Sequence, residues 1–443
     1  MKDVLVLGAG MVAGPLVGYL LDQPDINVKV ASRTHSKAQK LVDDHPRGSV
    51  ESLDVEKPES AKKLEELVSS ADLVVSILPY IHHVKVAEFA IKHRKNMVTT
   101  SYVSDAMRAL DSQAKEAGII ILNESGLDPG IDHMSAMRII HKVEEGKGKV
   151  VSFKSTTGAL PAQEANNNPF GYKFSWSPKG VLLASRNAAK WLEEGKEISI
   201  LGEQLFENYH IQDVPDVGSF ENYPNRNSLP YKEIYGLSDA KTVYRGTFRN
   251  VGWCETLRAI VALNWLDDEP VPAFSGKTYK DLTGKLMGAD PSKDLSEEVA
   301  IFLGLKPYSA VIKRLSWLGL FGDETLPDDK DNPLDYLNVL TLKKMSMDKD
   351  DRDMVVMLHE FVVEYPDRKE YITSTLVDFG IPNGDTSIAR TVGIPAAIAV
   401  KLIVQGKIGP KGVHIPTKPE IYNPILDELE EHDIKFKEKR TPI

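Results

Sequence analysis

The sequence predicts an α/β protein that combines a parallel-sheet domain, a second α+β domain built on a mixed sheet, and an all-helical insertion. Residues 1–125 alternate between short apolar runs and helical patterns, as in a doubly wound sheet. From about residue 149, apolar and polar side chains alternate as in half-buried strands. Residues 267–350 resemble short helices joined by turns rich in Pro, Gly and Asp.

The length of 443 residues is too great for one ordinary core, so two or three domains are expected. We expect residues 1–125 and about 390–443 to form the first domain. The chain leaves this domain to form the second domain and the insertion, so its C-terminal segment is expected to return and pack on the first domain. Residues 126–266 and about 351–389 should form the second sheet domain, for substrate and dimerisation. Residues 267–350 should form the insertion.

The amino-acid composition disfavours several classes of function, among them nucleic-acid binding and membrane proteins. The net charge of −10 disfavours nucleic acid or an anionic membrane as a partner, although an anionic small substrate needs only a local basic pocket. Cys254 is the one cysteine, so neither an intrachain disulfide nor a cysteine zinc site is expected. No apolar run approaches the ~20 residues of a membrane span, and the chain starts with a strand rather than a signal peptide. We therefore expect a cytoplasmic protein.

The first strand and helix flank a glycine-rich turn. An apolar run precedes the sequence Gly-Ala-Gly-Met-Val-Ala-Gly of residues 8–14, and a helical pattern follows. Gly8 permits a sharp turn, Gly10 leaves room for a pyrophosphate, and Ala13 allows close packing of helix on strand. With Met11 and Val12 between them, these residues predict a Rossmann-type dinucleotide site; the alternative is a tight turn that binds nothing.

The residues at the end of the second strand indicate which dinucleotide cofactor the protein binds. NAD-preferring folds usually place an acid there, but this chain has Ser32, Arg33 and Thr34. A guanidinium and hydroxyls can bind a ribose 2′-phosphate through charge-assisted hydrogen bonds, so NADP(H) is predicted. Alternatively, Arg33 is a solvated surface charge or stacks on the adenine.

Other candidate residues follow the later strands, because ligands bind at the carboxyl ends of parallel strands. Asp54, with Val55, is placed to contact the adenine, although a plain turn aspartate fits as well. The predicted crevice lining comprises Ile77, Leu78, Thr100, Ser101, Tyr102, Ser125, Gly126, Leu127 and Asp128.

Tyr102 and Asp128 are the candidates for acid–base or charge-stabilising roles in this crevice. Asp128 precedes Pro129, so it also fits a helix N-cap followed by Pro at the first helical position. His133 lies inside that helix and is expected to make structural hydrogen bonds.

The second half of the chain offers two arginines for carboxylate capture. Arg226 lies in a loop with Asn and Ser, and Arg245 is followed by Gly246 and Thr247. The alternative for each arginine is a structural salt bridge. The strands expected here are residues 150–158, 198–201, 206–209, 220–223, 242–248, 352–361, 368–379 and 434–436. The expected helices are residues 180–195, 252–266, 282–287, 295–303, 309–318, 333–344, 387–404 (broken by Gly393 and Pro395) and 421–431.

These features favour hydride transfer, in which a cofactor carries the chemistry and the protein orients the substrate. The chain has no Ser-His-Asp signature, Walker motif or HExxH motif, and no His/Glu spacing that indicates a metal site.

Several blocks together resemble the saccharopine reductases, the glutamate-forming saccharopine dehydrogenases of the α-aminoadipate lysine pathway. The most specific block reads Gly-Leu-Asp-Pro-Gly-Ile-Asp-His-Met from residue 126, and the blocks are residues 5–15, 78–82, 100–102, 124–134, 172–178 and 353–359. The resemblance covers essentially the whole chain and is closest to the stand-alone form found in fungi.

The resemblance implies NADPH-dependent, reversible reduction of the imine of L-glutamate and L-2-aminoadipate 6-semialdehyde to L-saccharopine in lysine biosynthesis. It implies a three-domain subunit, usually in a homodimer. Positions that match its substrate contacts are Ser101, Tyr102, Asp128, Ser175, Arg226, Arg245, Gly246 and Thr247. The proton donor stays open.

Two other functions are kept as alternatives. One is a related oxidoreductase of the carboxynorspermidine or homospermidine synthase type, whose substrate lacks three carboxylates. The other is a non-catalytic NADP-binding scaffold.

Overall fold

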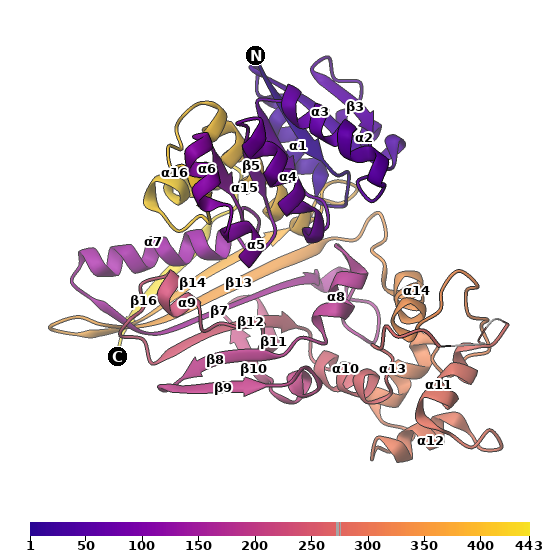
Figure 1. Cartoon of the computed structure of the whole chain (residues 1–443). Coiled ribbons are helices and arrows are strands. Elements are labelled where there is room, and N and C mark those ends of the chain that lie inside the picture. The colour runs from indigo at the N-terminus through magenta and orange to yellow at the C-terminus, as the bar shows by residue number, and fades with distance from the viewer. Residues whose placement is uncertain (272–273, 275) are drawn as a thin grey trace. The chain divides into compact units, whose positions relative to one another are not determined.

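The computed structural model describes residues 1–271, 274 and 276–443, which divide into two compact units (Figure 1). Unit 1 comprises Met1–Lys149, Tyr365–Asp367 and Ser374–Lys439. Unit 2 comprises Val150–Glu364, Arg368–Thr373 and Arg440–Ile443. The finer division into three domains stays a prediction.

A parallel sheet forms the centre of unit 1, as expected. Within the described residues it has seven strands in the order β15-β6-β5-β4-β1-β2-β3, and the neighbours pair in parallel. The order reverses direction at β1, which is where doubly wound folds bind their ligands. The strands are β1 (Lys2–Leu7), β2 (Ile26–Ser32), β3 (Gly48–Ser52), β4 (Leu73–Ser76), β5 (Asn96–Thr99), β6 (Ile120–Leu122) and β15 (Gly412–His414).

Helices cover both faces of this sheet. Apolar side chains of α3 (Ala61–Ser70), α4 (His83–Lys92) and α6 (Asp111–Ala117) form one core with the sheet. On the other side, α1 (Ala13–Asp22) packs against α15 (Ser387–Val404), as Figure 1 shows. The remaining helices of this unit are α2 (His35–Val42), α5 (Asp105–Arg108), α7 (Ile131–Glu145) and α16 (Pro419–Glu431).

Helix α15 corrects one expectation, since it continues through Gly393 and Pro395 rather than breaking there. A side chain at Gly393 would lie 3.0 Å from the Val12 carbonyl oxygen, so glycine lets α15 approach the glycine-rich turn closely. By length and composition α15 could cross a membrane, but 78% of its 18-residue window is buried inside the protein. Core helices commonly share that composition.

A second, mixed sheet has most of its strands in unit 2, and parts of β14 and β16 belong to unit 1. The order within the described chain is β10-β11-β12-β7-β13-β14-β16, with β8 pairing to β12 and β9. Strand β12 runs parallel to β7 and antiparallel to β11 and β8. The strands are β7 (Lys149–Pro161), β8 (Ala189–Glu193), β9 (Lys196–Ile200), β10 (His210–Val214), β11 (Gly218–Pro224), β12 (Thr242–Arg249), β13 (Asp353–Glu364), β14 (Lys369–Phe379) and β16 (Phe436–Pro442).

The helices expected between residues 252 and 344 are confirmed. They are α10 (Trp253–Ala262), α11 (Tyr279–Met287), α12 (Leu295–Phe302), α13 (Ala310–Leu318) and α14 (Pro333–Met345). Side chains of Thr278, Asp294, Ser309 and Asn332 cap the last four of these helices, which explains their sharp starts.

Two elements of unit 2 differ from expectation. The helix predicted over residues 180–195 is only α8 (Pro178–Ala184), and the chain then forms the β8–β9 hairpin. Residues 206–209 were expected to form a strand but include the end of the 3₁₀ helix η4 (Gly202–Glu207). In the first place, strand pairing of β8 with β9 and β12 prevails over the local helical pattern, and in the second, η4 packs against α10 instead of pairing as a strand.

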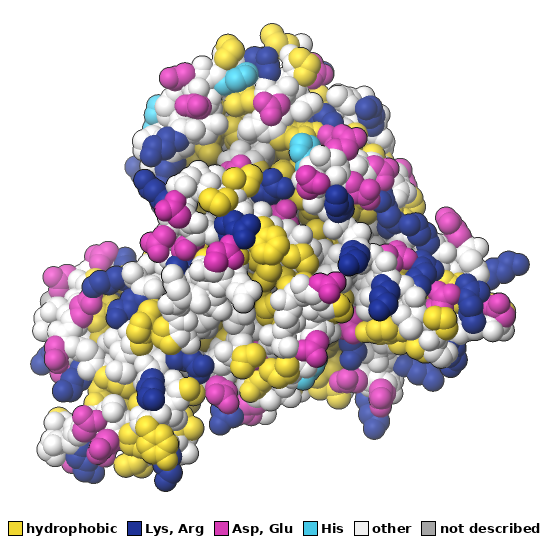
Figure 2. Space-filling view, turned by 180° about the vertical axis from the view of Figure 1, so that it is seen from behind, with side chains coloured by type: hydrophobic (Ala, Val, Ile, Leu, Met, Phe, Trp, Pro, Cys, Tyr) yellow, Lys and Arg dark blue, Asp and Glu magenta, His cyan; other side chains and the backbone are white. Residues whose placement is uncertain are grey.

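Charges of both signs mix on the face shown in Figure 2, where Lys and Arg side chains are interspersed with Asp and Glu. Such a surface offers no broad field of one sign on that face. The expected absence of nucleic-acid and membrane partners stays a prediction.

Candidate active site

The glycine-rich turn has the geometry expected for a pyrophosphate cradle. Gly8 has φ +114°, which disfavours any side chain, and a Cβ there would lie 3.1 Å from the Ile77 carbonyl oxygen. A Cβ on Gly10 would enter open space among the described residues. Helix α1 then begins at the fully buried Ala13, behind Val12, whose side chain has no capping group. The first-turn N–H groups are thus oriented for an anion.

The end of β2 places a cation on the surface beside this turn. Arg33 lies 3.2 Å from the Glu56 carboxylate, and both side chains are exposed. An exposed pair of this kind contributes little stability. The Thr34 N–H donates to Ser32 Oγ, and the Glu56 N–H donates to Asp54 Oδ1, next to Val55. Arg33 is therefore a surface charge that a 2′-phosphate can recruit.

We expect Arg33→Ala to weaken NADPH binding roughly 10- to 100-fold, because one charge-assisted phosphate contact is worth about 1.5–3 kcal/mol. NADH affinity should change by less than twofold. Fluorescence titration with both cofactors measures the effect, with Lys40→Ala on helix α2 as a control. Equal wild-type affinity for NADPH and NADH would contradict this role.

The segments after β4, β5 and β6 meet at the carboxyl edge of the sheet. The Ile77 N–H donates to the Leu7 carbonyl oxygen, and the Ser125 N–H donates to that of Thr99. A Cβ on Gly126 would lie 3.2 Å from Thr100 Cβ. The structure thus brings together, in unit 1, the predicted residues Ile77, Leu78, Thr100, Ser101, Tyr102, Ser125, Gly126, Leu127 and Asp128.

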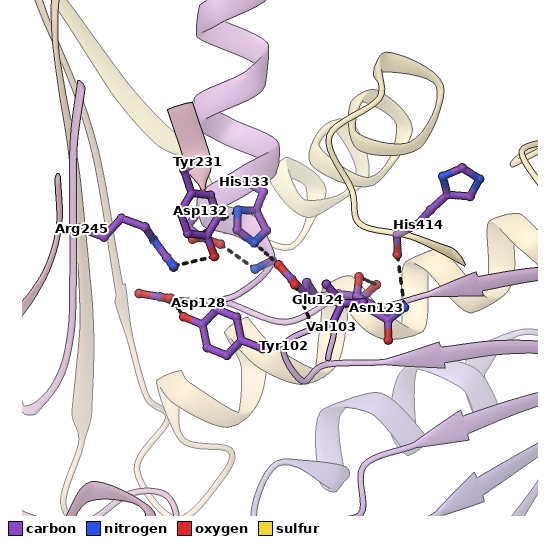
Figure 3. Close-up of polar contacts among 12 residues, drawn as sticks. Tyr102, Val103, Asn123, Glu124, Asp128, Asp132, His133, Tyr231, Arg245 and His414 are labelled. Carbon is purple, nitrogen blue, oxygen red and sulfur yellow. Dashed lines mark hydrogen bonds and ion pairs between the residues drawn. The ribbon is translucent and has the colours of Figure 1, made fainter. Parts of the chain in front are cut away.

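Tyr102 and Asp128 form a pair. The Tyr102 hydroxyl donates to Asp128 Oδ1 at 2.8 Å, and the two side chains point toward each other in Figure 3. The N-cap expectation for Asp128 is wrong: helix α7 begins at Ile131, and Gly130 is its N-cap residue. The Asp128–Pro129 peptide bond is cis, and the Gly130 N–H donates to Asp132 Oδ1 rather than to Asp128.

A buried hydrogen bond between His133 and Glu124 lies next to this loop. His133 Nε2 lies 2.6 Å from Glu124 Oε2, and both side chains are almost completely buried. Glu124 Oε1 accepts a hydrogen bond from the Val103 N–H, next to Tyr102 (Figure 3). His133 therefore makes the structural hydrogen bond that was expected of it.

His83 was missed by the sequence reasoning. Its Nδ1 lies 2.9 Å from Ser76 Oγ, and its Nε2 lies 2.8 Å from Ser101 Oγ and 3.1 Å from Thr99 Oγ1. The ring thus connects the ends of β4 and β5 and orients the Ser101 hydroxyl. Only its place after an apolar strand, in Tyr80-Ile81-His82-His83, could have drawn attention to it.

Burial lowers the pKa of His83 to about 4, from an ordinary value of 6.5. Between these values the unfolded chain binds the extra proton, so the free energy of unfolding should fall as pH drops from 6.5 to 4. The contribution of His83 is about 3 kcal/mol and is fully present above pH 6.5.

We expect His83→Asn to lose this pH dependence, which urea unfolding at several pH values would measure. Exposed His35→Asn is the matched control and should retain the wild-type slope. Identical slopes for His83→Asn and wild type would contradict the assignment.

In unit 2, Arg245 is buried in strand β12. Its Nη1 donates to the Tyr231 hydroxyl at 2.8 Å, as Figure 3 shows, and its guanidinium lies 4.5 Å from the centre of the Tyr231 ring. Its backbone N–H donates to Ser228 Oγ. These contacts hold the guanidinium in one orientation.

The other predicted residues of unit 2 have different surroundings. Arg226 is exposed, with φ +55°, in the loop after β11. Gly246 has a packing reason to be glycine, since a Cβ would lie 2.1 Å from Asn222 Oδ1. Thr247 is half-buried between β11 and β7, and Ser175 is buried ahead of α8.

Comparisons with known proteins give one consistent result. Residues 4–122 match the model described as saccharopine dehydrogenase NADP binding domain, and residues 126–434 match the saccharopine dehydrogenase C-terminal domain. The Schizosaccharomyces pombe saccharopine dehydrogenase [NADP(+), L-glutamate-forming] is 38% identical over 449 residues, which cover 99% of each chain.

Two further relatives extend this result. The apo structure of the Saccharomyces cerevisiae saccharopine dehydrogenase (L-Glu forming) superposes with a TM-score of 0.89 at 38% identity and covers 100% of both chains. The mouse mitochondrial alpha-aminoadipic semialdehyde synthase is 38% identical over 99% of this chain but only 48% of its own length.

Proposed function

The chain belongs to the saccharopine dehydrogenase family, and from this premise we propose that it interconverts L-saccharopine with L-glutamate and L-2-aminoadipate 6-semialdehyde. It is an NADP-dependent oxidoreductase acting on a C–N bond. The biosynthetic direction reduces the imine of the two products to saccharopine, in lysine synthesis by the α-aminoadipate pathway. The similarity over the full chain length is the observation that carries this proposal.

The residues of unit 1 fit NADP(H). Gly10 has no side chain to block a pyrophosphate, and no side chain caps the first turn of α1, so the N–H groups there can bind it. Arg33 and the neighbouring hydroxyl groups can bind the 2′-phosphate. The bound cofactor supplies the hydride. We assign to its binding Gly8, Gly10, Met11, Val12, Ala13, Ser32, Arg33, Thr34, Asp54, Val55, Ile77, Leu78, Thr100, Ser125, Gly126 and Leu127.

The Tyr102–Asp128 pair supports a charge-stabilising role. The C=N group that is reduced carries a positive charge when its nitrogen is protonated. A carboxylate beside that nitrogen stabilises this charge. The Tyr102 hydroxyl holds Asp128 in one orientation through the 2.8 Å hydrogen bond. Ser101 is oriented in turn by His83 and is proposed to contact the substrate.

Substrate carboxylates are proposed to bind the arginines of unit 2. Saccharopine carries three carboxylates, and a guanidinium can bind each one through two parallel hydrogen bonds. Arg245 is preoriented by Tyr231, and Arg226 projects from an exposed loop. Ser175, Gly246 and Thr247 complete the proposed substrate set.

The family resemblance supports two further proposals, a homodimer and a cytoplasmic location. Light scattering coupled to size-exclusion chromatography tests the first: a mass twice that of the 49.1 kDa chain is expected. A monomer at micromolar concentration would contradict it.

The reaction itself is tested by following absorbance at 340 nm while the purified protein oxidises saccharopine with NADP⁺ and, separately, with NAD⁺. Reduction of NADP⁺ with release of glutamate is the expected result. If absorbance changes with neither cofactor, in a protein that binds NADPH, the result would contradict the proposal. It would favour a polyamine-forming oxidoreductase or a non-catalytic scaffold.

A further inference from the structure

Arg245, Thr247 and Arg249 lie at alternate positions of β12, so their side chains share one face of the sheet. Thr157 of β7 and Tyr223 of β11 pair with Thr247 on either side of it. One face of three neighbouring strands therefore carries two guanidiniums separated by hydroxyl groups.

Arg249 is a buried cation held by aromatic rings. The residue is 6% exposed, and its guanidinium carbon lies 4.9 Å from the Tyr172 ring centre and 5.4 Å from that of Trp253. Its Nη1 donates to the Phe248 carbonyl oxygen. Among the residues that the structure describes, no carboxylate forms an ion pair with it.

Glu221 is the nearest acid by strand register, since it lies opposite Arg249 on β11. Its two oxygens are used elsewhere: Oε1 accepts from the Gly252 N–H and Oε2 from the Cys254 N–H, both at 2.7 Å. Glu221 thus holds the start of α10 and leaves the guanidinium without a carboxylate in contact.

Further hydrogen-bonding groups around Arg249 lack partners. Within residues 1–271, 274 and 276–443, the buried polar atoms without a hydrogen-bond partner include Arg249 Nε, Trp253 Nε1, the Tyr172 hydroxyl and Thr157 Oγ1. Each unmade hydrogen bond of a buried group is costly, and a buried cation without a counter-ion is more so. All four can donate a hydrogen bond. Three of them, on Arg249, Tyr172 and Trp253, lie in one cluster, which is therefore complementary to an anion.

We propose that Arg249, with Tyr172 and Trp253 beside it, binds a carboxylate of the substrate. The inference rests on the proposed function, because it assigns a further carboxylate of the same tricarboxylate. Arg245 and Arg249 are four residues apart, which separates their Cα atoms by about 13 Å along the strand. Two anchors at that spacing select a long substrate with carboxylates at its ends over a short amino acid.

The test compares Arg249→Gln with the wild-type enzyme on saccharopine and on its three monoamides, each with one carboxylate made neutral. Arg249→Gln should raise the saccharopine KM roughly 10- to 100-fold, while the NADP⁺ KM stays within twofold. For the wild-type enzyme, each monoamide should have a higher KM than saccharopine. For Arg249→Gln, one monoamide should have the same KM as saccharopine, and the other two should still have a higher KM. Arg186→Gln, in the exposed pair with Asp268, is the control for the same chemical change.

Two outcomes would overturn the inference. One is an unchanged saccharopine KM in Arg249→Gln, and the other is an equal loss for all four substrates together with a lower melting temperature. If Arg249→Gln does not fold, Tyr172→Phe and Trp253→Phe keep a ring and remove one donor each. Both should raise the saccharopine KM several-fold, and no change in either would overturn the inference. A wild-type protein inactive on saccharopine would instead reject the proposed function itself.

Discussion

Gly130→Ala is expected to remove at least about 4 kcal/mol from the free energy of unfolding, or to prevent accumulation of folded protein. Gly130 has φ +151°, and an added Cβ would lie 2.0 Å from the Gly126 carbonyl oxygen. That oxygen accepts the Ile131 N–H at the start of α7, so it has no room to move aside. The change would displace the loop that carries Asp128, and activity would be lost with stability.

Gly118→Ala is the matched control for this prediction. Gly118 also has a positive φ, +72°, but a Cβ there would meet open space among the described residues. Its cost should be only about 1–2 kcal/mol, the ordinary cost of a left-handed conformation. Urea unfolding of both variants measures the difference. Similar losses in the two would show that backbone conformation, rather than the contact with Gly126, sets the cost.

Arg245→Gln is expected to raise the KM for saccharopine at least about 100-fold while leaving the KM for NADP⁺ within twofold. Arg245 is only 3% exposed, and its guanidinium is already ordered by the Tyr231 hydroxyl and ring, so little entropy opposes its contact with a carboxylate. Steady-state kinetics with each substrate varied in turn measures the two constants.

Tyr231→Phe separates positioning from direct binding. It removes the hydroxyl that holds Arg245 but keeps the ring beneath the guanidinium, so the saccharopine KM should rise by a smaller factor, roughly 5- to 20-fold. A parallel rise of both KM values in Arg245→Gln, with a lower melting temperature, would identify Arg245 as a structural residue instead.

Much of unit 1 was predictable because its signals are local. The turn from Gly8 to Ala13 combines strand, glycine positions and helix start within a dozen residues. The cofactor preference for NADP(H) follows from Ser32-Arg33-Thr34 in the same way. The expected parallel sheet, the helices between residues 252 and 344, and membership of the saccharopine dehydrogenase family are confirmed. The individual roles of the site residues stay predictions.

Errors arose where distant segments compete with local preference. The apolar pattern of residues 180–195 suits a helix, but pairing of β8 with β9 and β12 makes its second half a strand. Asp128 before Pro129 has the residue types of a helix start, but the hydrogen bond from Tyr102, 26 residues earlier, uses its carboxylate.

The class of fold, the cofactor and the family can be read from the sequence alone, because each depends on residue types at fixed short spacings. Three features became visible only in the folded chain: His83 supports Ser101, Gly130 must lack a side chain, and Arg249 is buried without a carboxylate in contact among the described residues. The physical reason is the same in all three cases. Hydrogen bonds, steric contacts and desolvation act between atoms that folding brings together, and the partners are not neighbours in the chain.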